Sequence, residues 1–104
     1  MIVEERTYHV FTGKLAEAVR LYAEEGTELQ QRILGNLIGA FTVDIGDLSS
    51  LVQLWGYDDF AERERRRAQL QADETWKEFL SRLTPLIHTQ KSRILVPTSF
   101  SPIR

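Results

Sequence analysis

The chain has 104 residues, of which 42% are hydrophobic and 27% charged, and its formal net charge is −2. These values are ordinary for one globular domain with a core of its own, whereas a dedicated nucleic-acid binder would be clearly basic. Because the chain has no cysteine, a disulfide framework, a thiolate nucleophile and a Cys-ligated metal are all excluded.

The N-terminal segment carries charge from Glu4 onward and has no apolar signal core. No apolar run in the chain approaches the length that crosses a membrane. We therefore expect a soluble, cytoplasmic protein without a membrane partner. A single domain is expected over residues 1–104, with 97–104 as an extended C-terminal tail.

Residues 2–11 are rich in β-branched and aromatic types and end at Thr12, which predicts a strand. A helix is predicted over about 13–34, capped by Thr12, because apolar residues recur there at helical spacing. Gly26 lies inside this helix and is expected to mark a bend, and Gly35 is a natural C-terminal stop.

Residues 36–45 and 50–57 alternate in character as strands do. Gly46 begins a turn between them, so the two segments are predicted to form a hairpin. Trp55 and Tyr57 are two residues apart and therefore lie on one face of the second strand.

Asp59 begins a capping-box pattern that predicts a helix, which Asp73 restarts and Pro85 ends. Residues 86–96 are predicted to form the last strand. The order βαββαβ predicts an α+β, ferredoxin-like fold, in which two helices cover one face of a four-stranded antiparallel sheet.

The two helices leave the other face of the sheet uncovered. The residues expected beneath the helices are small or branched: Ile38, Ala40, Val52 and Leu54. The open face would then carry larger apolar side chains: Phe41, Val43, Leu51, Trp55 and Tyr57. A monomer rarely exposes so large an apolar patch, so we expect a homodimer with facing sheets and the proline-bearing tail reaching across to its partner.

Motifs spread over nearly the whole chain carry a family resemblance. In chain order they are Glu5-Arg6-Thr7-Tyr8, Gly13-Lys14, Gly35, Gly39, Ile45-Gly46, Val52-Gln53-Leu54-Trp55-Gly56-Tyr57-Asp58, Arg63, Arg67, Trp76, Ser92-Arg93-Ile94-Leu95-Val96-Pro97 and Phe100-Ser101-Pro102. Together they resemble the NIPSNAP family, a branch of the dimeric α/β-barrel proteins. The resemblance implies a ferredoxin-like protomer that pairs sheet to sheet around a central cavity.

The resemblance implies no particular reaction, because family members share no agreed catalytic set. The wider superfamily includes cofactor-free monooxygenases, haem-binding or haem-degrading enzymes and lactone isomerases, which is an analogy of fold alone. Two positions depart from the family pattern. Gln53 stands where relatives often have histidine, which removes an acid–base group, and Glu5 stands where they tend to be apolar.

The candidate ligand-binding residues are those expected to face the cavity: Arg6, Tyr8, Phe41, Gln53, Trp55, Tyr57 and His88. Arg6 offers a charged, planar donor fork for a carboxylate or phenolate, and Tyr8 can donate to a developing oxyanion. The first and third strands are neighbours in this fold, which would place both beside Gln53. Alternatively, Arg6 pairs with Glu4 or with an acid of the partner chain, and the aromatic residues only fill the dimer core.

His88 is the other candidate for proton transfer or haem ligation, because His9 alternates away from Arg6 and Tyr8. A single strand histidine is more often structural. No His/Asp/Glu spacing predicts a metal site, and neither a nucleophile elbow nor a phosphate-binding glycine loop is present. No cofactor is therefore expected.

The charged segment from Glu62 to Arg67 alternates in sign on a predicted helix. This pattern is typical of a solvated, salt-bridged face rather than a nucleic-acid site. Arg63 and Arg67 lie four residues apart on one face, and at least one of them is expected to anchor the hairpin or the tail.

Three functions stay open. The first is a homodimer whose inter-sheet cavity binds a small apolar or aromatic ligand with an anionic or phenolic end. The second is a cofactor-independent monooxygenase or isomerase, and the third is a structural or interaction module with a filled dimer core. An enclosed space of ~300 Å³ or more favours the first two.

Overall fold

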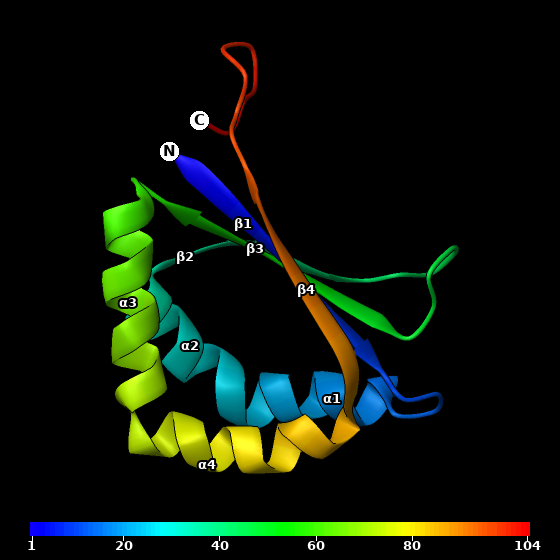
Figure 1. Cartoon of the computed structure of the whole chain (residues 1–104). Coiled ribbons are helices and arrows are strands. Elements are labelled where there is room, and N and C mark those ends of the chain that lie inside the picture. The colour runs from blue at the N-terminus through cyan, green and yellow to red at the C-terminus, as the bar shows by residue number, and fades with distance from the viewer.

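The computed structural model describes all residues, 1–104. Its elements are β1 (Ile2–Val10), α1 (Leu15–Leu21), the π-helical turn η1 (Tyr22–Gly26), α2 (Thr27–Leu34), β2 (Asn36–Thr42), β3 (Ser50–Tyr57), α3 (Phe60–Ala72), α4 (Glu74–Leu83), the 3-10 turn η2 (Thr84–Leu86) and β4 (Ile87–Leu95). The strands form one antiparallel sheet in the order β2-β3-β1-β4. All helices lie on one side of this sheet (Figure 1). The predicted α+β, ferredoxin-like fold is confirmed.

Helix boundaries follow the capping chemistry of the sequence. The Asp59 carboxylate accepts a hydrogen bond from the backbone N–H of Glu62 at 2.8 Å, and Asp73 accepts one from Trp76 at 2.8 Å. Both are N-caps, which satisfy a free N–H in the first turn of α3 and α4. At the end of α2, Gly35 adopts a φ of +95°, which favours glycine. These boundaries were predicted from the sequence and are confirmed.

The first helical segment differs from the prediction at its start and in its middle. The N-cap is Lys14 rather than Thr12 and makes no side-chain hydrogen bond, because Gly13, with a φ of +84°, turns the chain first. The expected bend is a π-helical turn that ends at Gly26. A Cβ at this glycine would lie 2.5 Å from Cζ of Phe79. Gly26 is therefore needed for the close approach of η1 to α4.

Strand pairing shows that the predicted assignment of the two sheet faces was wrong. Trp55 pairs with Glu4 and Tyr57 pairs with Ile2 on the side that the helices cover, and both aromatic side chains are buried. Leu51 lies on the same side. The open side instead carries Val52, Leu54 and Ile38. The physical reason is size: bulky rings fill the space between sheet and helices, whereas branched side chains suit an uncovered pleated surface.

A register shift in β2 moves its side chains from one face to the other. Leu37 pairs with Trp55 on the helix side, whereas Phe41 pairs with Val52 on the open side, where it is 55% exposed. Within one bulge, the strand therefore changes the face on which its apolar residues lie. Phe41 is on the open face, as predicted, and Ala40 lies on the helix side, also as predicted.

The core lies between the sheet and the helices. Tyr22, Trp76 and Phe79 form an aromatic cluster, with ring centroids 5.3 Å apart for Tyr22 and Phe79 and 5.0 Å apart for Trp76 and Phe79. This cluster joins η1 to α4. None of the helices combines the length and the apolar character that a bilayer crossing requires.

Candidate functional site

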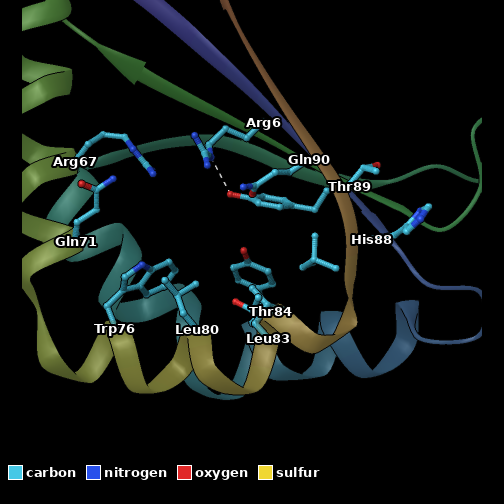
Figure 2. A pocket seen from close by; sticks show the side chains of 13 residues that line it. Arg6, Arg67, Gln71, Trp76, Leu80, Leu83, Thr84, His88, Thr89 and Gln90 are labelled. Atoms are coloured by element: carbon cyan, nitrogen blue, oxygen red, sulfur yellow. Dashed lines mark hydrogen bonds between the residues drawn. The ribbon is translucent and has the colours of Figure 1, made fainter.

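A cavity of about 430 Å³ lies between the sheet and the helices of the same chain. Its apolar wall is formed by Tyr22, Trp76, Leu80, Leu83 and Ile87, and its polar wall by Arg6, Tyr8, Arg67, Gln71, Thr84, Thr89 and Gln90. Figure 2 shows the residues of α4 on one side of the cavity and Arg6 and Gln90 of the sheet on the other. This volume suits a small organic molecule. This cavity lies within one protomer, whereas the predicted cavity between the sheets of two protomers stays a prediction.

Arg6 is held from two sides. Its Nη1 donates to the Glu4 carboxylate at 2.9 Å, and its Nε donates to the Tyr8 hydroxyl oxygen at 2.7 Å (dashed line in Figure 2). The pairing with Glu4, one of the two alternatives that the sequence left open, is confirmed. Because Tyr8 accepts this hydrogen bond, its own O–H is still available to a ligand.

Glu4 is fully buried and joins three elements. It accepts hydrogen bonds from Arg63 of α3 at 3.1 and 3.0 Å and from the Ser92 hydroxyl of β4. Burial alone would raise the pKa of Glu4, but the hydrogen bonds from Arg63 and Ser92 and the charge of Arg6 lower it to about 2. Glu4 is therefore a permanent negative charge beneath the cavity.

Arg67, unlike Arg6 and Arg63, has no acidic partner. It reaches from α3 into the cavity, where its guanidinium group faces that of Arg6 (Figure 2). It forms no ion pair and no side-chain hydrogen bond, and no acidic side chain lines the cavity. Burial lowers the pKa of Arg67 and the charge of Arg6 lowers it further, while Glu4 opposes both effects. A half-buried guanidinium without a counter-charge is suited to bind an anion.

Tyr22 provides a second phenol beside Tyr8, with the ring centroids 6.3 Å apart. Burial raises the pKa of Tyr22 well above its ordinary value, and its neighbour Tyr8 adds to this effect. Tyr22 is therefore a neutral donor at physiological pH. It belongs to the π-helical turn, an irregularity that is frequent at functional sites.

The structure brings only part of the predicted site together. Arg6, Tyr8 and His88 border the cavity. In Figure 2, however, the His88 ring points away from it, and the ring lies 4.9 Å from that of Phe11. His9 lies on the face of the sheet opposite Arg6 and Tyr8, as its alternation predicted.

The other predicted residues lie elsewhere. Phe41 and Gln53 border a separate hollow of about 300 Å³ on the far side of Tyr22. Trp55 and Tyr57 border neither space. Trp55 donates from Nε1 to the Gln53 amide oxygen at 3.1 Å, which makes it part of the core. Burial raises the pKa of Tyr57 to about 12, so it stays neutral.

Sequence reasoning missed Arg67 as a site residue. The signal was its spacing of four from both Arg63 and Gln71, which puts all three on one face of α3. Arg63 anchors Glu4 of β1, so the expectation that one of the two arginines anchors the hairpin or the tail was wrong. The inward face of α3 was not predicted, because the charges of this helix alternate in sign as they do on a solvated helix.

No cluster of three or more His, Cys, Asp or Glu side chains in the structure is close enough to hold a metal ion. The charged groups at the cavity are instead guanidinium groups, which bind carboxylates and other oxyanions directly. The arrangement can therefore hold an anionic group at one end and an apolar body at the other.

Comparisons with known proteins place the chain among relatives along its full length. A family model described as NIPSNAP matches residues 3–102. A NIPSNAP family protein from Agrobacterium tumefaciens is 48% identical, with a TM-score of 0.97 over 99% of this chain and 98% of that protein. Protein NipSnap homolog 1 from Danio rerio is 31% identical over 99% of this chain. The chain spans only 36% of that relative's length.

A more distant likeness concerns the fold alone. A putative antibiotic biosynthesis monooxygenase from Nitrosomonas europaea has a TM-score of 0.69 at 11% identity, over 93% of this chain and 98% of that protein. At this identity, shared architecture carries no information about shared chemistry.

Proposed function

This chain belongs to the NIPSNAP family, which fixes its fold but not its chemistry, and we propose that it binds a small molecule in the cavity between its sheet and its own helices. The ligand would have an apolar or aromatic body and an anionic end. The observation that carries the proposal is Arg67, a half-buried guanidinium without a counter-charge. A hydrogen bond to a charged group contributes about 1.5–3 kcal/mol, which is enough to select an anion.

The remaining walls of the cavity fit such a ligand. Trp76 and Tyr22 present aromatic surface on the apolar side, and Tyr8, Gln71 and Gln90 present donors on the polar side. Few polar groups on a largely apolar wall are the usual composition of a small-molecule site. The volume of about 430 Å³ leaves room for such a ligand within one protomer.

Replacement of Arg67 tests the proposal. We expect purified protein to bind 2-naphthoate, an aromatic carboxylate, in isothermal titration calorimetry. Arg67→Gln should weaken this binding by about tenfold or more, because the charged partner is lost. The matched control is Arg65→Gln, which removes the same charge from the exposed side of the same helix and should leave the Kd unchanged. Equal effects of the two substitutions would contradict the assignment of the cavity.

Cofactor-independent oxidation or isomerisation is the second candidate function. One observation favours it: the Tyr8 hydroxyl, which Arg6 Nε approaches at 2.7 Å, borders the cavity and can donate to a developing oxyanion. Such a reaction also requires a bound substrate. The enzyme hypothesis therefore depends on the same anion-binding residue as the ligand-binding hypothesis.

We also propose that the open face of the sheet pairs with a second copy of the chain. This face carries Val52 and Leu54, which are only half-buried, next to Phe41, which is 55% exposed, and Val96, which is 76% exposed. A self-complementary interface would remove this apolar surface from water. In such a dimer the ligand cavity lies on the opposite side of each sheet from the interface.

A further inference from the structure

We infer that the cavity selects ligands whose anionic end carries one negative charge, and that buried Glu4 sets this preference by neutralising Arg6. The inference rests on the proposed ligand-binding function and adds the charge class of the ligand. It points to an organic carboxylate and away from a phosphate monoester.

At the polar end of the cavity, the positive and negative side-chain charges cancel except for one positive charge. Arg6 and Arg63 both donate to Glu4, at 2.9 Å and at 3.1 and 3.0 Å, and Arg63 also pairs with the exposed Glu64 at 2.6 Å. In this group two guanidinium charges meet two carboxylate charges. Arg67 is the charge left over.

Arg6 is not free to neutralise a ligand, although it borders the cavity. Its Nη1 and Nε are both engaged, and the Glu4 side chain that it contacts is 0% exposed. Glu4 is also held by Arg63 and by the Ser92 hydroxyl, so an incoming anion cannot displace it without leaving a buried charge unpaired. Arg6 can still donate a hydrogen bond to a ligand, but its charge is already compensated.

No other cationic side chain adds positive charge to the cavity. Lys91 and Arg93 pair in register with Thr7 and Glu5, which places them on the open face of the sheet. The ring of His88 points away from the cavity (Figure 2). The site therefore presents a net charge of about one to a ligand.

The other polar groups of the cavity are neutral. Tyr8, Gln71, Thr84 and Gln90 border it and can donate hydrogen bonds to the second oxygen of a carboxylate without adding charge. A phosphate monoester carries close to two negative charges above neutral pH, so it would bring one uncompensated charge into a partly desolvated site.

Matched probes with one ring system test the inference. We would measure the Kd of 2-naphthoate and of 2-naphthyl phosphate for the full chain by calorimetry at pH 8, where the phosphate is doubly charged. Wild-type protein should bind the carboxylate at least about tenfold more tightly than the phosphate. Glu4→Gln, which releases the charge of Arg6, should shift this ratio toward the phosphate by about tenfold or more.

A second variant keeps the test decisive if Glu4→Gln does not fold. Gln71→Arg adds one positive charge at the cavity wall without disturbing the buried network, and it should also shift the ratio toward the phosphate. Gln69→Arg adds the same charge at an exposed position of α3 and should leave the ratio unchanged.

The possible results distinguish a failure of the single-charge preference from a failure of ligand binding itself. If wild-type protein binds the phosphate as tightly as the carboxylate, or if Gln71→Arg leaves the ratio unchanged, the single-charge preference is overturned while ligand binding stands. If neither probe binds in a manner that depends on Arg67, the proposed function fails and the inference fails with it.

Discussion

Replacement of Glu4 by glutamine should remove the part of the pH dependence of stability that Glu4 contributes between about pH 4.5 and 2. The pKa of Glu4 falls from 4.5 to about 2 on folding, so its ionised form contributes about 3 kcal/mol to the free energy of unfolding at neutral pH. The folded-state pKa is the lower one. This contribution is therefore complete above pH 4.5 and is lost as the pH falls toward 2.

Urea unfolding followed by circular dichroism at a series of pH values from 7 to 2.5 measures this effect. At pH 7, Glu4→Gln should be less stable than wild type by about 3 kcal/mol, because Arg6 and Arg63 lose their shared counter-charge. The difference between the two proteins should shrink as the pH falls. Glu5→Gln is the matched control: its partner Arg93 is exposed, and an exposed pair contributes less than about 1 kcal/mol.

Two results would refute this reasoning about Glu4. One is a stability difference between wild type and Glu4→Gln that stays constant over the whole pH range, which would show that the ionisation of Glu4 is not linked to folding. The other is a Glu4→Gln variant more stable than wild type, which would show that burial of the carboxylate outweighs its three partners.

Two further predictions concern packing and assembly. Gly26→Ala should lower the free energy of unfolding, because overpacking against Phe79 costs about 1–3 kcal/mol and the gain in helix propensity is at most about 1 kcal/mol. Urea unfolding checks this, Phe79→Leu should relieve the loss, and a stabilised Gly26→Ala would contradict the close approach. Val52→Glu, on the open sheet face, should turn a dimer into a monomer in light scattering, whereas Gln69→Glu should not. A wild-type chain that is monomeric at micromolar concentration would refute the proposed dimer.

The elements were predictable because their signals are local. Asp59 and Asp73 cap helices through bonds that span three residues, and Gly35 ends α2 by its own backbone conformation. Topology also predicted correctly that Arg6 would lie next to Gln53, because these residues are partners in the β1–β3 ladder. Such inferences need only chain order and spacing.

The face that each strand presents to the helices was not predictable in this way. Alternation shows that Trp55 and Tyr57 share a face, but it does not show which face the helices cover. That choice depends on the distance between sheet and helices, which is a tertiary quantity. The same holds for Arg67, whose side chain points from α3 toward the cavity (Figure 2).

Because the structure reverses the predicted sheet faces, it also changes the expected effect of dimerisation on ligand binding. In the sequence-based hypothesis the second copy of the chain closed the ligand cavity, so loss of the dimer would abolish binding. In the structure the sheet separates the two: Arg67 and the cavity lie on the helix side, and Val52 lies on the open side. Val52→Glu should therefore leave the Kd of 2-naphthoate unchanged, and Arg67→Gln should leave the mass in solution unchanged. A loss of binding in the monomeric variant would show instead that assembly shapes the cavity through the sheet, whose Arg6 and Tyr8 form its polar wall.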